Sequence, residues 1–307
     1  MKPDIITLYM NRELPLNPHS PLQKLSSALF DAHDLNVYVK RDDLIHPFIS
    51  GNKWRKCFYL LKHIVNSGYK TAVTFGGAYS NHIHAFSYAC NQLGLKSVGI
   101  IRGEELASKP LNSTLSFARD NGMELIFVSR DEYKKRYDET YNEELAMKHE
   151  AYVVPEGGTT LLAIDGFKEM LNEIRSEIQF DSIWVPCGSG GTIAGINTNL
   201  LNTEQVIGIN VLKGTERELT ETIQDFSSIN NYIINNDYHF GGYAKHTSEL
   251  LTFVDNFEKD FNIELEEVYS AKMFYAFFDM VNKGAIKNKT VVLCHTGGLQ
   301  AKIHKKS

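Results

Sequence analysis

The sequence lacks the patterns that mark several large classes of protein. Its four cysteines, Cys57, Cys90, Cys187 and Cys294, include no CxxC pair, which argues against a zinc site and against a disulfide framework. No apolar run approaches the length needed to cross a bilayer, and residues 1–14 lack the apolar core of a signal peptide. We therefore expect a cytoplasmic protein with reduced, mostly buried thiols and no membrane partner.

Clustered basic charge is also missing. The chain has 32 basic and 37 acidic residues, a net charge of −5, and no long block of Lys and Arg. A nucleic-acid-binding surface needs such a block, so we expect no nucleic-acid partner. His82 and His84 are two residues apart, which places them on different helical faces, and no HExxH motif occurs. We predict no metal site.

What the chain does contain is a repeated alternation of strand and helix patterns. Its 307 residues, 43% hydrophobic and 22% charged, are typical of a globular protein large enough for two lobes. From residue 35 onward, short β-branched runs alternate with segments of helical period, which predicts an α/β fold of parallel sheets with flanking helices. We expect a large domain made of 1–54 and 161–307, a small domain made of 55–160, and a cleft between them at the strand carboxyl ends.

Several elements are predicted with definite bounds. Strands are expected at 35–40, 152–154 and 263–269, and helices at 131–150, 216–226 and 248–261. The stretch 227–243 has a coil-like composition, with breaks at Asn230-Asn231 and Gly241-Gly242. Long irregular loops are uncommon unless they are functional, so we expect this stretch to be a lid or a pocket wall.

Lys53 is the first candidate for chemistry. It closes a Gly-Asn-Lys turn and opens a helical pattern in which Cys57, Leu60, Leu61, Ile64 and Val65 share one face. A lysine in this place can capture an aldehyde cofactor or a carbonyl substrate as a Schiff base, or it can be a solvated lysine at a helix start.

A glycine-rich loop follows a Val-rich strand and precedes a helix. Glycines let the backbone approach an anion closely, and a helix N-terminus adds free N–H groups, so this loop has the character of a phosphate cradle. A tight strand-to-helix turn that simply needs glycine is the alternative, and the spacing matches neither a Walker loop nor GxGxxG. The loop comprises Gly188, Ser189, Gly190, Gly191 and Thr192.

Two further pairs of residues remain open between structure and function. Ser80 and Asn81 open a helix near His82, where they can be N-caps, or where a hydroxyl beside a lysine amine can carry protons. Tyr243 and Tyr269 end irregular or extended segments, where a phenol can face a cleft or pack in the core.

Together, four stretches resemble one family. Ser50-Gly51-Asn52-Lys53, Gly76-Gly77 through His82, Gly188 to Thr192, and His295 to Gly298 resemble, in order, the motifs of the pyridoxal-phosphate-dependent branch that contains 1-aminocyclopropane-1-carboxylate deaminase and D-cysteine desulfhydrase. The spacings of 27 residues from Lys53 to Ser80 and 26 from Tyr243 to Tyr269 are similar to the family's as well. The resemblance covers nearly the whole chain and implies a tryptophan-synthase-β-like fold, pyridoxal phosphate as cofactor, and a homodimer.

The resemblance also implies roles for individual residues. Lys53 would form the internal aldimine and later move protons, and Ser80 would contact the substrate as nucleophile or proton carrier. Asn81 would bind the cofactor's phenolic oxygen, and Ser189 to Thr192 would hold its phosphate. Tyr243 and Tyr269 would flank the substrate.

Two positions depart from the family pattern. Ser270 stands where the cyclopropane deaminases have a glutamate facing the pyridine nitrogen and the desulfhydrases have a hydroxyl residue. A hydroxyl stabilises a pyridinium less than a carboxylate does, which favours β-elimination over opening a strained ring. Tyr79 stands where glutamine is common and reshapes the pocket. We therefore expect a lyase or deaminase similar to D-cysteine desulfhydrase; a cyclopropane-carboxylate deaminase and a non-catalytic cofactor carrier are the alternatives.

Overall fold

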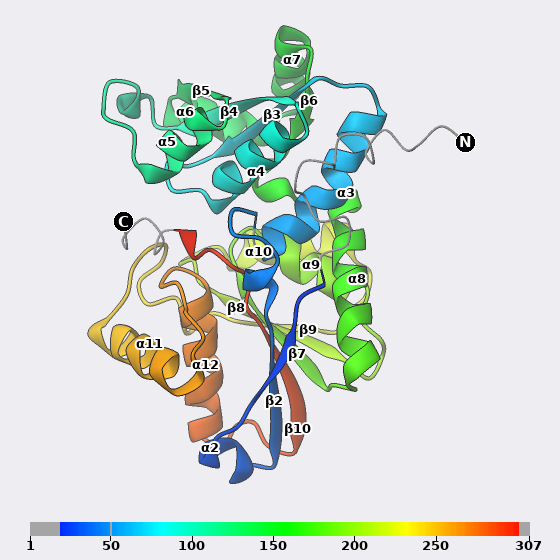
Figure 1. Ribbon diagram of the computed structural model, residues 1–307, viewed down its shortest axis with the longest axis vertical. Helices are drawn as coiled ribbons and strands as arrows, with labels where there is room; N and C mark the ends of the chain where they lie inside the picture. Colours follow the sequence, from blue (N-terminus) through cyan, green and yellow to red (C-terminus); the bar gives the residue numbers. More distant parts are fainter. Residues whose placement is uncertain (1–18, 50, 301–307) are drawn as a thin grey trace. The chain divides into compact units, whose positions relative to one another are not determined.

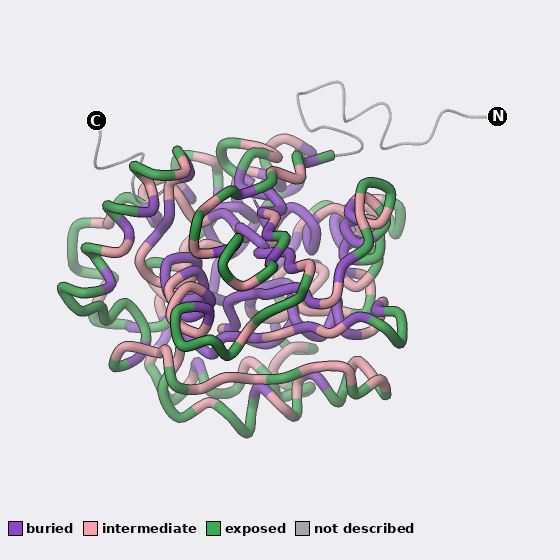
Figure 2. Tube along the Cα trace, turned by 90° about the horizontal axis from the view of Figure 1, so that it is seen from below, coloured by how far each residue is buried: buried purple, intermediate pink, exposed green. Residues whose placement is uncertain are grey.

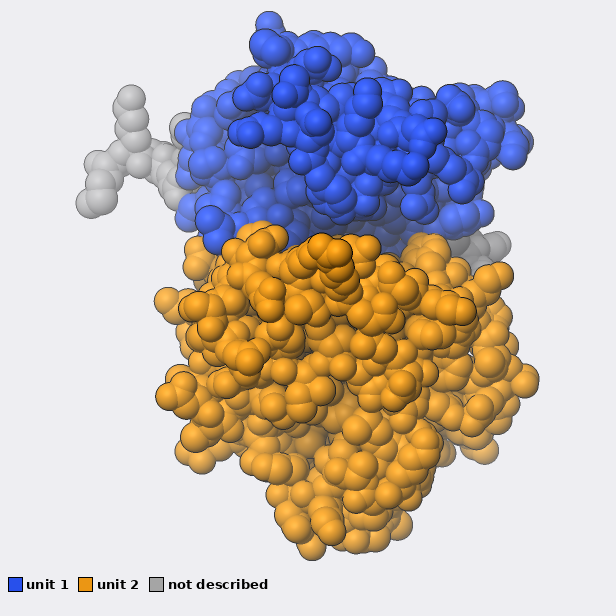
Figure 3. Space-filling model, turned by 180° about the vertical axis from the view of Figure 1, so that it is seen from behind, with its two compact units in different colours: residues 1–18, 46–49, 53–163 blue, residues 19–45, 50–52, 164–307 orange. Residues whose placement is uncertain are grey.

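The computed structural model describes residues 19–49 and 51–300. The contacts divide the chain into two compact units, coloured separately in Figure 3. Within the described part of the chain, unit 1 holds residues 46–49 and 53–163, and unit 2 holds residues 19–45, 51–52 and 164–300. The predicted domain bounds at 54/55 and 160/161 stay a prediction.

Unit 2 is built on a six-stranded sheet with the order β1-β2-β10-β7-β8-β9. All neighbouring strands are parallel except β1, which pairs antiparallel with β2. This pattern confirms the predicted α/β fold with a largely parallel sheet. The strands are β1 (Leu22–Leu25), β2 (Leu35–Lys40), β7 (Ser182–Cys187), β8 (Gln205–Asn210), β9 (Tyr232–Asn235) and β10 (Lys289–Cys294).

Helices cover both faces of this sheet (Figure 1). One apolar cluster joins β7 and β8 to α8 (Leu161–Glu177), α9 (Gly191–Asn197) and α10 (Glu216–Phe226). A second cluster joins β2 and β10 to α2 (Ala28–Asp31), α11 (Ser248–Phe261) and α12 (Ser270–Asn282). Parallel strands buried on both faces read as continuous apolar runs, as β7 does with all six of its residues buried.

Unit 1 is built on a second, four-stranded parallel sheet with the order β5-β4-β3-β6. Its strands are β3 (Thr71–Gly76), β4 (Lys96–Arg102), β5 (Met123–Val128) and β6 (Tyr152–Val154). Its helices are α3 (Asn52–Asn66, of which Asn52 belongs to unit 2), α4 (Asn81–Gln92), α5 (Ser113–Asp120), α6 (Arg130–Lys134) and α7 (Glu139–His149). Figure 2 colours the Cα trace by burial: the buried stretches lie in the interior, and the exposed residues lie in the outer loops and on the outer turns of helices.

Local sequence patterns explain most of these elements. The predicted strands at 35–40 and 152–154 and the predicted helices at 216–226 and 248–261 are confirmed. In α3 the residues Cys57, Leu60, Leu61 and Ile64 are buried on one face, as their period of about 3.6 predicts, and Val65, the fifth residue expected there, is partly buried. A left-handed glycine, Gly68 with φ of 83°, follows the end of this helix.

Three predicted elements are wrong. The strand expected at 263–269 is irregular, because the Glu266 carboxylate accepts hydrogen bonds from the backbone N–H groups of Val268, Tyr269 and Ser270. The helix expected at 131–150 breaks into α6, a 3₁₀ turn at Lys135–Tyr137 and α7, since Asp138 caps α7 by accepting from Tyr141 N. The coil expected at 227–243 contains β9, which pairs with β8.

None of the helices in the described ranges has the length and apolar character that a membrane span needs. The same ranges contain no group of three or more His, Cys, Asp or Glu side chains arranged to hold a metal ion.

Candidate active site

Lys53 lies in the first turn of α3 and is partly buried. Burial lowers the pKa of Lys53, while Cys57 and Glu156 act in the opposite direction. A lowered pKa increases the share of the neutral amine, which is the form that attacks a carbonyl carbon. The side chain therefore has the environment that Schiff-base chemistry requires.

His82 and Lys56 belong to the same part of unit 1. The Thr74 hydroxyl donates to the Val154 carbonyl at 3.1 Å, so its contact of 2.8 Å with His82 Nε2 must be donated by the imidazole. His82 Nδ1 is then an acceptor, and it is buried without a hydrogen-bond partner among the described residues. Burial, with the charges of Lys53 and Lys56, holds the pKa of His82 well below its usual range, so the ring is neutral.

The turn after β6 closes against these two side chains. Lys56 is 1% exposed and donates to the Gly157 carbonyl at 3.3 Å and to Thr159 Oγ1 at 3.1 Å. A Cβ on Gly158 would lie 3.2 Å from His82 Cε1, closer than nearly all real contacts. Glycine at position 158 thus lets the backbone of this turn approach the histidine. Lys56 was missed in the sequence, although it lies three residues after Lys53, at a spacing that brings helical side chains together.

Ser80 and Asn81 stand at the start of α4. Ser80 is the N-cap, and its Oγ accepts from Ile83 N at 3.3 Å. A cap uses the hydroxyl oxygen as acceptor and leaves the hydroxyl hydrogen for another partner. Capping and proton transfer are therefore compatible at this residue. Tyr79, just before it, is 64% exposed.

In unit 2, the glycine loop joins β7 to α9. Gly190 has φ of 84° and is the N-cap of α9, so a left-handed residue is needed there. A Cβ on Gly188 would lie 3.0 Å from Tyr269 Cε1, which shows that the loop contacts this tyrosine. Thr192, 7% exposed, accepts a hydrogen bond of 2.9 Å from Asn52 Nδ2. The loop is thereby tied to the residue that directly precedes Lys53.

A second turn packs against the residues before Lys53. Gly51 has φ of 64°, and a Cβ there would lie 1.8 Å from the Thr296 carbonyl oxygen. Asn52 N donates to the same oxygen at 3.4 Å, and Gly51 N donates to the Asp42 carbonyl at 2.8 Å. Ser50, the first residue of the motif, lies outside the described residues.

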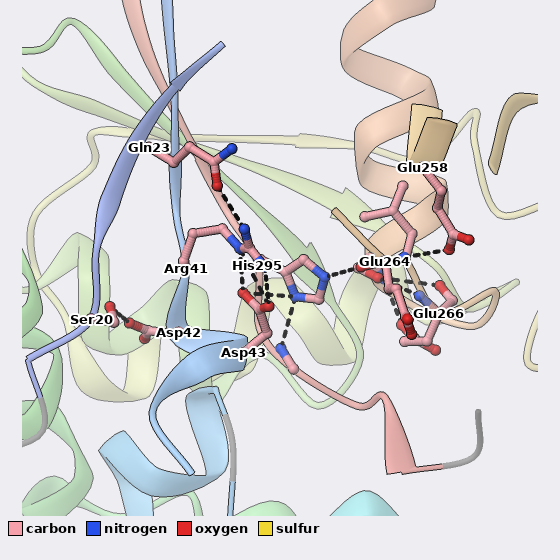
Figure 4. Close-up of polar contacts among 12 residues, drawn as sticks. Ser20, Gln23, Arg41, Asp42, Asp43, Glu258, Glu264, Glu266 and His295 are labelled. Carbon is pink, nitrogen blue, oxygen red and sulfur yellow. Dashed lines mark hydrogen bonds and ion pairs between the residues drawn. The ribbon is translucent and has the colours of Figure 1, made fainter. Parts of the chain in front are cut away.

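His295 shapes that turn from inside the protein (Figure 4). Its Nε2 donates to the Glu264 carbonyl at 2.7 Å, and its Nδ1 accepts from Gly297 N at 3.2 Å. Asp43, which Arg41 holds through a contact of 2.8 Å, lies 3.7 Å from Nδ1. Burial lowers the pKa of His295, and the neutral ring is the form that can accept from Gly297 N. The motif at 295–298 was recognised in the sequence, but this role was not.

Tyr243 and Tyr269 lie near each other. Their ring centroids are 6.4 Å apart and the rings are inclined by 70°. Tyr243 is 45% exposed, so its phenol is accessible. Ser270, the first residue of α12, is fully buried; its Oγ accepts from Glu266 N at 3.0 Å and lies 3.2 Å from the Glu266 carbonyl, to which it can donate. Unit 2 therefore gathers Tyr243, Tyr269 and the glycine loop in one place.

Comparison with known proteins identifies the family. Residues 15–297 match the family described as pyridoxal-phosphate dependent enzyme. The chain belongs to this family. A bifunctional D-cysteine desulfhydrase/1-aminocyclopropane-1-carboxylate deaminase of Arabidopsis thaliana is 31% identical over 291 residues, which are 86% of this chain and 72% of that protein. A protein of Thermotoga maritima named "Putative 1-aminocyclopropane-1-carboxylate deaminase" is 33% identical over 310 residues, which are 94% of this chain and 96% of that protein. A D-cysteine desulfhydrase of Serratia proteamaculans is 28% identical, with 92% of each chain covered.

Solved structures agree with this assignment. The crystal structure of a homologue of ACC deaminase (1-aminocyclopropane-1-carboxylate deaminase) superposes with a TM-score of 0.76 at 28% identity, covering 99% of both chains. A threonine deaminase of Solanum lycopersicum has a TM-score of 0.69 at 18% identity, which shows the common fold. The pyridoxal-phosphate-dependent enzyme described here thus has the fold type II architecture.

The residues of the enzyme fit the cofactor. Lys53 offers an amine of lowered pKa to an aldehyde, and the glycine loop leads directly into the N-terminus of α9. Within unit 2 the loop suits an anionic group at the start of α9, and within unit 1 the Lys53 amine suits a carbonyl carbon.

Proposed function

We propose that this enzyme is a lyase that removes ammonia from a small amino acid by β-elimination, as D-cysteine desulfhydrase does. For cysteine, one substrate molecule and one water give pyruvate, ammonia and hydrogen sulfide. The observation that carries this choice is Ser270, a neutral hydroxyl at the first residue of α12. Pyridoxal phosphate, when bound, supplies an aldehyde for the substrate amine and a conjugated ring that accepts electrons.

Each candidate residue has a specific task in this proposal. Lys53 Nζ would hold the cofactor through its aldehyde and would accept the proton from the substrate α-carbon. Ser80 binds the substrate through its hydroxyl hydrogen, and Asn81 donates to the cofactor's phenolic oxygen. Tyr243 and Tyr269 orient the substrate and protonate the leaving sulfur. Ser189, Gly190, Gly191 and Thr192 bind the phosphate with Gly188 giving close approach.

The hydroxyl of Ser270 supports elimination over ring opening. It brings no negative charge to the ring nitrogen, so it stabilises the protonated ring less than a carboxylate would. Its single hydrogen also has another acceptor, the Glu266 carbonyl at 3.2 Å. A weaker electron acceptor is sufficient when the leaving group is a good one, such as a thiol, and is less suited to breaking a carbon–carbon bond of a cyclopropane.

Parallel assays test the proposal. Sulfide release from D-cysteine and from L-cysteine is measured beside 2-oxobutyrate release from 1-aminocyclopropane-1-carboxylate, with the wild type and with Ser270→Glu. We expect sulfide from one cysteine enantiomer to exceed cyclopropane turnover by at least ~100-fold, a difference of about 2.7 kcal/mol in transition-state stabilisation, and the variant to narrow this ratio. Faster turnover of the cyclopropane substrate by the wild type would refute the proposal and favour the deaminase alternative.

A further inference from the structure

Lys272 is a buried lysine that the proposed chemistry does not use. It lies in the first turn of α12, two residues after Ser270, and is 0% exposed. Its Nζ donates to the carbonyl oxygens of Gly242 at 2.8 Å, His239 at 2.9 Å and Val211 at 3.4 Å. A lysine ammonium has three N–H donors and here all three meet backbone oxygens.

Two of the carbonyls that accept from Lys272, those of His239 and Gly242, belong to an irregular segment. Between β9 and α11, the chain has positive φ angles at Phe240, Gly241, Gly242 and Ala244. Such backbone is strained for residues other than glycine and persists only when surrounding contacts hold it. The segment forms turns of its own, with Gly242 N donating to the His239 carbonyl at 3.0 Å. Lys272 joins these turns to the sheet, because the same Nζ also donates to the carbonyl of Val211, just beyond the end of β8.

The next residue after this connection is Tyr243. Gly242 is buried and accepts directly from Lys272, whereas Tyr243 is 45% exposed and faces Tyr269 at 6.4 Å between ring centroids. The other tyrosine is held from the same helix start, because the Glu266 carboxylate accepts from Tyr269 N at 2.5 Å. The backbone beside each phenol is thus held by a buried ionisable side chain: Lys272, in the first turn of α12, for Tyr243, and Glu266, just before α12, for Tyr269.

We propose that Lys272 is a positioning residue for Tyr243, and that its ammonium fastens the turn at 239–242 to the end of the sheet. The effect on turnover rests on the proposed role of Tyr243, but the fastening itself can be measured without turnover. Lys272 does not contact the reacting atoms in this account; it acts through the backbone of Gly242.

Hydrogen–deuterium exchange of the cofactor-loaded enzyme tests the fastening. Lys272→Met removes all three donors and keeps a chain of similar length. We expect peptides covering 236–247 to exchange at least ~10-fold faster than in the wild type. Lys259→Met is the matched control, since Lys259 is an exposed lysine in the last turn of α11, at the end of that helix far from residue 247 in the chain. Unchanged exchange at 236–247 in a folded Lys272→Met enzyme would overturn the proposal.

If Lys272→Met does not fold, Lys272→Gln keeps two donors and takes its place. We expect it to speed exchange in the same peptides by a smaller factor, and protection equal to the wild type would overturn the proposal equally.

A double-mutant cycle tests the path through Tyr243. We expect Lys272→Met to lower kcat by ~10–100-fold with little change in KM, but to lower it by less than ~2-fold in the Tyr243→Phe background. An equal loss in both backgrounds would show that Lys272 acts by another route. If no amino acid is turned over, the proposed function fails while the exchange experiment still decides the fastening.

Discussion

Replacing Gly51 with alanine should strongly disrupt the active site. Its φ is 64°, and the new Cβ would lie 1.8 Å from the Thr296 carbonyl oxygen, against an ordinary contact of 3.4–4 Å. To lengthen this Cβ–oxygen distance from 1.8 to 3.4 Å, the two turns must move apart by about 1.6 Å. The backbone itself must move, because the atom that the Cβ meets is a backbone oxygen. That movement would disturb Asn52, whose side chain is bonded to Thr192.

The expected magnitude follows from this displacement. A misplacement of about 1 Å near a reacting group can cost about 100-fold in rate, so we expect kcat/KM to fall by at least ~100-fold and cofactor affinity to fall with it. Gly284→Ala is the control, because Gly284 has a similar φ of 69° and nothing within 4 Å of the added Cβ. It carries only the backbone cost of about 1–2 kcal/mol.

Titration of each variant with pyridoxal phosphate, followed by absorbance, and thermal unfolding separate the two effects. Gly284→Ala should lose a few degrees in Tm and bind the cofactor normally. If Gly51→Ala bound pyridoxal phosphate and turned over substrate like Gly284→Ala, the inferred contact between the two turns would be refuted.

Three further outcomes are expected. Burial raises the pKa of Glu266 from 4.5 to about 7, so its contribution to stability is full below pH 4.5 and is lost as pH rises through 7, by about 3 kcal/mol. In urea titrations, the free energy of unfolding should therefore change less between pH 5 and pH 8 for Glu266→Gln than for the wild type or for the control Glu267→Gln. Equal changes in all three proteins would contradict this. Gly188→Ala places a Cβ 3.0 Å from Tyr269 Cε1 and should weaken cofactor binding several-fold at unchanged Tm, whereas unaltered binding would show that the ring yields freely. Phe277→Ala, in the core beside Trp184, should lower the free energy of unfolding by about 3–5 kcal/mol in urea titration, and a loss under 1 kcal/mol would mean that this cluster repacks.

The period of the apolar residues, together with the residues that end helices and strands, made much of the fold predictable. Helices such as 216–226 have an apolar stripe and clear ends, and the strand at 35–40 is followed by polar loop residues. The strand expected at 263–269 failed because alternating Ile263 and Leu265 resemble a strand, whereas the Glu266 side chain binds the following N–H groups and ends any extended run. β9 was missed because its pairing with β8 is a long-range contact.

The candidate site was predictable only in part for the same reason. Lys53 and the glycine loop are recognisable from neighbouring residues, so the sequence alone predicts them as candidate site residues. Which nitrogen of His82 carries the hydrogen depends on Thr74 and Val154, and the role of Lys272 depends on carbonyls 30 to 61 residues away. Partners so distant in the chain leave no local pattern.

The central claim is that Lys53 holds the cofactor, and one experiment tests it most directly. The enzyme is loaded with pyridoxal phosphate, reduced with borohydride, digested and analysed by mass spectrometry, beside Lys53→Ala and the neighbouring Lys56→Ala. We predict that the reduced cofactor is found on the peptide containing Lys53, that Lys53→Ala loses this adduct, and that Lys56→Ala retains it at Lys53. An adduct on another lysine in the wild type, or one that survives in Lys53→Ala, would contradict the account.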